Sequence, residues 1–183
     1  MVWSCRQARR QANVGEMPQF IHLADDKELA SIERNGIRAD SETWSHRGVF
    51  AVPVLPSYTM THQWLRELKR RGMKTLSAVQ FFLPAREPVF VGSYRDREPI
   101  STTASGAVGI FRGHTSPLGL QSFIPRKIAA KEIRRIYTPS QVAGWRYFPD
   151  AHGKPPFCGC PYCQRGGIKN RKIREAYEDS FSE

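Results

Sequence analysis

One strand-to-helix junction near the N-terminus constrains the fold of this chain more than any other segment. The apolar run Phe20-Ile21-His22-Leu23-Ala24 is followed at once by a polar stretch with the pattern of a short helix. Asp25 can cap that helix, with a glutamate three residues later in the capping-box position, and Gly36 fits the stop at its C-terminal end. The sequence therefore predicts a strand carrying His22 to the first turn of a helix over 25–35.

Hydrophobic periodicity and turn residues predict the rest of the secondary structure. One long helix is expected over 57–71, because Met60, Trp64 and Leu68 recur at four-residue spacing. Helices come early and strands late, which favours an α+β fold over an alternating parallel one. The other expected elements are strands over 49–54, 75–83, 88–94, 119–124 and 132–137, a short helix over 101–112, a polar loop over 38–47 and a basic helix over 168–177.

Composition and the linker-like stretch with Pro and Gly after residue 149 predict three segments: an N-terminal arm over 1–19, a main domain over 20–149 and a Cys-rich basic tail over 150–183. The formal net charge of +11 favours a polyanionic partner, either a nucleic acid or an acidic protein. No run of apolar residues is long enough for a membrane span, and no secretory signal follows the N-terminal arginines. We therefore expect no membrane partner and a cytoplasmic location.

The tail contains a cluster of cysteines with metal-ligand spacing. Cys158, Cys160 and Cys163 lie within six residues, and the last two have the C-x-x-C spacing that lets two sulfurs hold one tetrahedral ion. His152 is one candidate for the fourth ligand, and Cys5 is the other. The pattern predicts a structural zinc ion that anchors the tail; free buried thiols or a redox pair are the alternative.

A basic stretch follows the cysteines. Its cations are expected to form one surface that contacts nucleic-acid phosphates, with Ile168 and Ile173 packed inward. A solvated helix face is the alternative that a run of charges also allows. The residues concerned are Arg165, Lys169, Arg171, Lys172 and Arg174.

Two motifs together resemble the ADP-ribosyltransferase fold. The first is the strand with His22-Leu23-Ala24, which stands where that family has His-x-Thr or a variant, followed by a helix that ends at Asn35-Gly36. The second is the segment 119–128, which resembles the strand that carries the family's glutamate. The order of elements between the two follows the family scheme from about residue 20 to residue 137. The resemblance implies split antiparallel sheets with flanking helices, and NAD as co-substrate.

The resemblance also implies roles for individual residues. His22 would hold the adenosine-side ribose, and the backbone of Leu23 would meet the nicotinamide amide. Arg47 is expected to take a pyrophosphate charge through a bidentate contact. The remaining residues assigned to the NAD site are Ala24, Phe50, Ser57 and Tyr58.

Gln121 occupies the position at which the family has its glutamate. A carboxylate there hydrogen-bonds the nicotinamide ribose and stabilises positive charge as nicotinamide leaves, whereas an amide keeps the hydrogen bond and lacks the charge. Three explanations are open: an engineered Glu→Gln substitution that disables a toxic enzyme, a natural glutamine, or a different alignment of the strand. The first is slightly favoured, because this exchange is the usual minimal inactivation.

The function implied by the resemblance is transfer of one ADP-ribose from NAD to RNA or single-stranded DNA. Such an enzyme would be the toxin of a bacterial toxin–antitoxin or phage-defence system, with an antitoxin protein as partner. Candidate stacking residues for a flipped base are Trp44, His46 and Arg47, together with Trp145, Arg146 and Tyr147. Two alternatives remain: an NAD-dependent RNA 2′-phosphotransferase-like enzyme, which uses basic residues in place of the glutamate, and a zinc-containing nucleic-acid-binding protein without chemistry.

Overall fold

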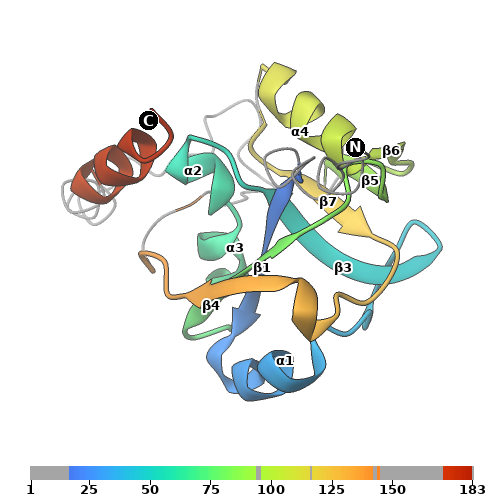
Figure 1. Cartoon of the computed structure of the whole chain (residues 1–183), viewed down its shortest axis with the longest axis horizontal. Coiled ribbons are helices and arrows are strands. Elements are labelled where there is room, and N and C mark those ends of the chain that lie inside the picture. Colours follow the sequence, from blue (N-terminus) through green and yellow to red (C-terminus); the bar gives the residue numbers. More distant parts are fainter. Residues whose placement is uncertain (1–16, 94–95, 116, 142–143, 145–170, 183) are drawn as a thin grey trace, which may run out of the picture.

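The computed structural model describes residues 17–93, 96–115, 117–141, 144 and 171–182. Figure 1 shows strands crossing the middle of the molecule, with α4 above them, α1 below and a helix over 171–179, the tail helix, at one side. The elements are β1 (Gln19–Asp25), a 3-10 turn η1 (Asp26–Glu28), α1 (Leu29–Asn35), β2 (Ser41–Thr43), β3 (His46–Pro53), α2 (Tyr58–Thr61), α3 (Leu65–Arg70), β4 (Leu76–Phe82), β5 (Pro88–Ser93), β6 (Ile100–Thr103), α4 (Ala104–Gly113), β7 (Leu120–Ile124), η2 (Ala130–Glu132) and β8 (Ile133–Tyr137).

The strands form one eight-stranded antiparallel sheet with the order β6-β5-β7-β3-β1-β4-β8, and β2 pairs with the outer part of β3. The pairing between neighbouring strands is shortest between β1 and β3, where only Phe20↔Pro53 and Ile21↔Val52 are paired. By contrast, β1 pairs with β4 along its whole length, Gln19↔Phe82 to Asp25↔Leu76. The expected α+β class, an antiparallel sheet with flanking helices, is confirmed.

Alternation along the strands separates a core face from an outer face. Val49, Ile124 and Val91 belong to the buried core, together with Ala107 and Phe111 of α4, which covers this part of the sheet. The residues between them in sequence lie on the opposite face, where Phe50, Phe123 and Phe90 are cross-strand neighbours on β3, β7 and β5. The outer face is therefore aromatic, and the site described below lies against it.

The helix predicted over 57–71 is wrong as a single element, because the chain breaks it at residues 62–64 into α2 and α3. His62 and Gln63 are completely buried at the break. His62 Nε2 lies 2.8 Å from the Tyr137 hydroxyl, and Gln63 Oε1 accepts a hydrogen bond of 2.6 Å from the Gly119 N–H. These tertiary contacts interrupt the helix at His62 and Gln63. Residue spacing within the segment could not predict them, because both partners are distant in the sequence.

Two short strands were not expected. The polar loop predicted over 38–47 is wrong, because it contains β2 and a two-residue turn in which Trp44 and Ser45 have φ of 48° and 61°. Such turns usually carry asparagine or glycine, so the sequence lacked the usual hairpin signal. The helix predicted from residue 101 starts at Ala104, because Thr103 caps it by accepting a hydrogen bond from the Gly106 N–H, and β6 takes the residues before it.

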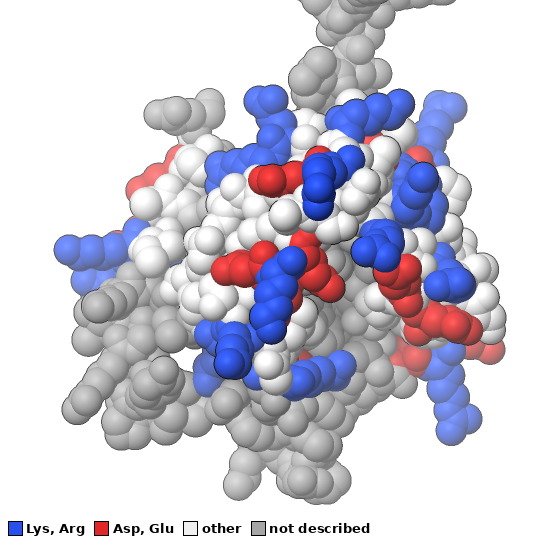
Figure 2. Space-filling model, turned by 90° about the horizontal axis from the view of Figure 1, so that it is seen from below, with Lys and Arg blue, Asp and Glu red and all other residues white. Residues whose placement is uncertain are grey.

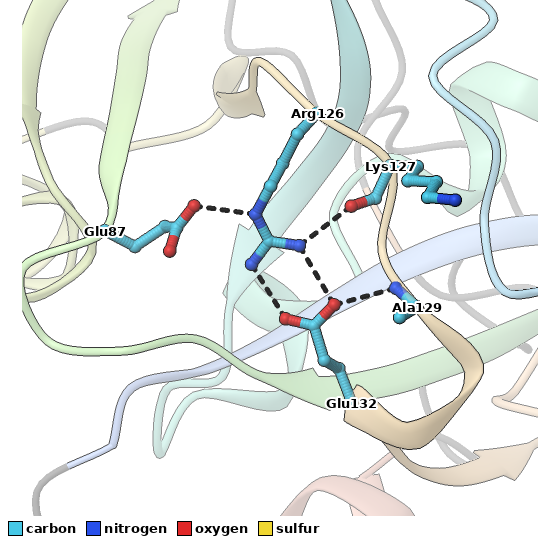
Figure 3. A network of polar contacts seen from close by, with 5 residues as sticks. All are labelled: Glu87, Arg126, Lys127, Ala129 and Glu132. Carbon is cyan, nitrogen blue, oxygen red and sulfur yellow. Dashed lines mark hydrogen bonds and ion pairs between the residues drawn. The ribbon is translucent and has the colours of Figure 1, made fainter.

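Arg126 joins three segments that are far apart in the sequence (Figure 3). Arg126 donates to Glu87 at 2.7 Å and forms a bidentate pair with Glu132 at 2.7 and 2.9 Å. Glu132 also accepts a hydrogen bond from the Ala129 N–H. Burial would raise the pKa of the Glu132 carboxyl, but the hydrogen bonds from Arg126 and Ala129 outweigh it and hold that pKa below its ordinary value. The network joins the segments before β5, after β7 and before β8.

Arg126→Met is expected to lower the free energy of unfolding by about 2 kcal/mol, because it leaves two carboxylates without their shared cation. The loss is smaller than for a fully buried pair, since 33% of the Arg126 side chain is exposed. Urea unfolding at pH 7 measures it. Arg38→Met is the matched control: Arg38 and Asp40 form a 4.0 Å ion pair with 72% and 69% exposed side chains, and we expect less than about 0.5 kcal/mol there. Equal losses would contradict a special role for Arg126.

The tail helix contacts the segment around α2 through Tyr177. The Tyr177 hydroxyl donates to the Leu55 carbonyl at 3.0 Å and lies 3.2 Å from Thr61 Oγ1, while its ring packs edge-on against Tyr58. Ile173, expected to pack inward, is 42% exposed, so that prediction is wrong. The boundary predicted at 149 lies outside the described residues and stays a prediction, and so does the boundary predicted at 19, where β1 begins. Among the described helices, none is both long and apolar enough to span a membrane.

Candidate functional site

A cavity of about 420 Å³ lies where β1, β3 and β7 meet α3. Its wall is mainly apolar and aromatic, with Phe50 on one strand and Trp64 at the start of α3. The polar side chains that reach it come from segments far apart in sequence: His22, Glu28, Ser41, Arg71 and Gln121. This composition, a largely apolar hollow with a few convergent polar groups, is typical of small-molecule sites.

A second cavity of about 370 Å³ adjoins the first and shares His22, Glu28 and Ser41 with it. It lies between the end of β1, α1 and the loop after Gly36. Its wall is more polar and carries charges of both signs: Lys27, Ser31, Arg38 and Asp40 join the shared residues. A ligand spanning both cavities would therefore place a flat apolar group in the first and a charged, hydroxylated group in the second.

His22 stands at the junction of the two cavities. Its Nδ1 lies 2.8 Å from the Phe50 carbonyl oxygen. Because a carbonyl can only accept, Nδ1 carries the proton and Nε2 is left as an acceptor. Burial lowers the pKa of His22, although the bond to Phe50 and the charge of Glu28 oppose the shift. The imidazole is therefore neutral at pH 7 and can accept a hydrogen bond from a ligand hydroxyl.

Gln121 is held in place by residues at the break between α2 and α3. Trp64 Nε1 donates to the Leu120 carbonyl at 2.9 Å, one residue before Gln121, and Gln63 accepts from the Gly119 N–H. On β7, Gln121 pairs with Gly92 of β5. A β-carbon at Gly92 would lie 2.9 Å from the Trp44 ring, so the glycine lets that indole cover the sheet beside Gln121. The carboxamide is half-buried and can donate and accept hydrogen bonds, but it supplies no charge.

The charged residues of the cavities were not identified from the sequence as site residues. Arg71 lies 3.3 Å from Glu67, whose side chain is fully buried. Their i,i+4 spacing was the one sequence feature that could have drawn attention to Arg71. Glu28 was expected to complete a capping box. In the structure Asp25 accepts from the Lys27 N–H, and Glu28 makes no side-chain capping bond. The capping-box prediction is therefore wrong for Glu28, which lines both cavities instead.

The structure gathers some of the predicted NAD residues and separates others. His22, Leu23, Phe50 and Gln121 line the first cavity. The others line neither cavity. Ala24 is buried in β1, and Arg47 is exposed beside the β2–β3 turn. Ser57 precedes α2 without a side-chain capping bond, and the Tyr58 hydroxyl accepts from the Ser140 N–H at 2.8 Å.

The aromatic residues proposed for base stacking differ in their environment. Trp44 donates to the Asp96 carbonyl and packs edge-on against Phe123, so its ring lies against the outer face of the sheet. His46 is exposed and stacks on Phe90, with ring centroids 4.5 Å apart. The other stacking candidates, Trp145, Arg146 and Tyr147, lie outside the described residues.

The predicted metal ligands Cys158, Cys160, Cys163 and His152, and the alternative Cys5, all lie outside the described residues. Within the described part of the chain no group of three His, Cys, Asp or Glu residues is placed to hold a metal ion.

Only part of the predicted nucleic-acid surface is described. Arg165 and Lys169 lie outside the described residues. On the tail helix Lys172 is exposed, Arg174 is half-buried and Arg171 pairs with Glu175 at 3.4 Å. Figure 2 shows Lys and Arg interspersed with Asp and Glu on the face seen from the α1 side, so that face is not uniformly basic.

Comparison with known proteins adds no assignment. The chain matches no family model, no curated protein and no solved structure.

Proposed function

We propose that this chain is a mono-ADP-ribosyltransferase that uses NAD. The observation that carries the proposal is the convergence of His22, Phe50 and Gln121, which come from three different strands, on one cavity. These are the residues that the resemblance to the ADP-ribosyltransferase fold assigned to NAD. The narrow junction between β1 and β3 also supports the comparison, because that fold has split sheets.

The two cavities suit the nicotinamide and the pyrophosphate of NAD. In the proposal nicotinamide lies in the apolar cavity against Phe50 and Trp64, with the backbone of Leu23 near its amide. A ribose hydroxyl donates to His22 Nε2. The pyrophosphate lies in the polar cavity near Lys27 and Arg38, which replace Arg47 in that role because Arg47 lines neither cavity.

The reaction breaks the bond between C1′ of the ribose and the nicotinamide nitrogen. Both electrons of that bond leave with nicotinamide, whose ring loses its positive charge, and the ribose gains oxocarbenium character. A nucleophile of the acceptor then bonds to C1′ and releases its proton to solvent. Gln121 donates or accepts a hydrogen bond at the ribose, and the buried wall excludes water from the reacting bond.

The proposed acceptor is RNA or single-stranded DNA. The support is the net charge of +11 and the exposed cation Lys172 on the tail helix. An enzyme of this kind would act as the toxin of a bacterial toxin–antitoxin or phage-defence system, with an acidic antitoxin as its protein partner. The zinc ion proposed for the tail would be structural and would take no part in the reaction.

Mass spectrometry of RNA, single-stranded DNA and protein incubated with NAD tests the proposal. We expect the native chain or Gln121→Glu, whose added negative charge lies beside the developing cation, to consume NAD and to add one ADP-ribose to one class of acceptor. Gln19→Glu is the matched control, since Gln19 lies on β1 and lines neither cavity. If neither the native chain nor Gln121→Glu binds or consumes NAD, the proposal is wrong.

A second candidate is an NAD-dependent RNA 2′-phosphotransferase-like enzyme. The observation that favours it is the set of cations at the cavities, Lys27, Arg38 and Arg71, without a glutamate on β7. RNA carrying a 2′-phosphate separates the two enzymes, because only this candidate would remove the phosphate. A zinc-containing nucleic-acid-binding protein without chemistry would bind RNA or DNA and leave NAD unbound.

A further inference from the structure

Among the residues that the structure describes, Glu28 is the only acidic one that lines both cavities. It ends the 3-10 turn η1, directly after the strand that carries His22, and its exposed side chain lies where the two hollows meet. A ligand that occupies both cavities must therefore pass beside this carboxylate.

The carboxylate of Glu28 is not engaged in holding the fold. Asp25 accepts the hydrogen bond at the start of η1, and Glu28, which precedes α1, makes no capping bond of its own. Among the described residues its carboxylate takes part in no side-chain hydrogen bond or ion pair, whereas the carboxylates of Glu67, Glu87 and Glu132 are all paired. Its charge nevertheless reaches the site, because it favours the protonated form of His22 against the effect of burial.

We propose that Glu28 is a catalytic residue, supplying the negative charge that Gln121 lacks. The inference rests on the proposed function. In it, the ionised carboxylate accepts a hydrogen bond from a hydroxyl of the nicotinamide-side ribose. As the C1′–nitrogen bond breaks and its electron pair leaves with nicotinamide, the negative charge of Glu28 stabilises the positive charge left on the ribose, and no proton is transferred to or from Glu28. The glutamine on β7 is then a partner in orientation, and the native chain is active.

The test measures NAD binding by calorimetry and nicotinamide release for the native chain and for Glu28→Gln. We expect Glu28→Gln to lower the rate of nicotinamide release roughly 100-fold, since it removes a charge that matters only as the bond breaks. NAD affinity should change by less than about threefold, because the ground-state hydrogen bond survives the substitution. Glu33→Gln is the matched control: Glu33 is an exposed glutamate on α1 that lines neither cavity.

The double variant Glu28→Gln with Gln121→Glu distinguishes a catalytic role of Glu28 from a purely structural one. A structural defect would not be repaired by a carboxylate at position 121. If the two positions supply the same charge to the same ribose, the double variant should recover most of the lost rate. Melting temperatures equal to that of Glu33→Gln would exclude unfolding as the cause.

The outcomes separate the two proposals. NAD cleavage by the native chain with equal rates for Glu28→Gln and Glu33→Gln overturns the role of Glu28 and leaves the transferase proposal standing. Loss of NAD binding in Glu28→Gln, without a separate effect on the rate, also overturns it. A native chain that neither binds nor cleaves NAD overturns both.

Discussion

The free energy of unfolding is expected to fall by about 3 kcal/mol between pH 7 and pH 4, because His62 is buried as a neutral imidazole. His62 is completely buried at the break between α2 and α3. Its Nδ1 lies 2.9 Å from the Tyr58 carbonyl and must donate, so Nε2 accepts from the Tyr137 hydroxyl at 2.8 Å. The rings of Tyr58, Tyr137 and Tyr177 pack around it.

The direction of this pH dependence follows from the pKa of His62. Burial lowers that pKa from 6.5 to about 4; the bond to Tyr58 opposes the shift, and the charge of Arg135 adds to it. Between these values the unfolded chain binds a proton that the folded chain does not, so stability rises with pH and is lost as pH falls. The stabilisation is complete above pH 6.5 and is lost by about pH 4. His22, whose pKa is also lowered by burial, contributes with the same sign.

Urea unfolding at several pH values between 4 and 7.5 measures the effect. The variant His62→Gln should be less stable at pH 7 but should lose far less stability on acidification, since it has no group to protonate. His46→Gln is the control, because His46 is exposed and its loss should leave the slope unchanged. A slope that persists in His62→Gln would assign the acid sensitivity to other groups, with His22 and Glu132 as the first to examine.

Gly36→Ala is expected to destabilise the fold by roughly 3 kcal/mol or more, since backbone strain and a steric clash add together. Gly36 has φ +78°, and its N–H donates to the Ile32 carbonyl at 2.8 Å to end α1. A β-carbon there would lie only 2.0 Å from the Ile128 carbonyl oxygen. That oxygen accepts from the Ile37 N–H at 2.8 Å, so backbone movement to relieve the clash would break the bridge beside the polar cavity.

Gly72→Ala separates the effect of backbone strain from that of the steric clash. Gly72 has φ +106°, but nothing lies within 4 Å of a β-carbon built on it. We expect this variant to lose only about 1 kcal/mol, the strain of a left-handed backbone without a clash. Chemical denaturation of both variants at pH 7 provides the comparison. Similar losses for the two would mean that the segment around Ile128 moves aside at little cost.

The sequence predicted the elements whose signal is local. The strand that carries His22 and the helix that ends at Gly36 are confirmed, because an apolar run and a glycine stop are properties of short segments, although residues 26–28 form the 3-10 turn η1 and only Leu29–Asn35 is α-helix. The strands that became β3, β4, β5, β7 and β8 are confirmed for the same reason. The continuous helix over 57–71 failed, since buried contacts of His62 and Gln63 with residues more than 50 positions away decided that segment.

The same division holds for the site. The sequence alone predicted that His22 lies on a strand that leads into a helix, and that Gln121 lies on a late strand; His22 is in the middle of β1, whereas the sequence suggested that it lies at the end. Only the tertiary structure decided that both face one cavity, that Glu28 lies between two cavities, and that Arg47 and Tyr58 line neither. The physical reason is that a strand's pattern fixes which face a side chain takes. The pairing of β3 with β7 and the packing of α1 and α3 decide what lies opposite it.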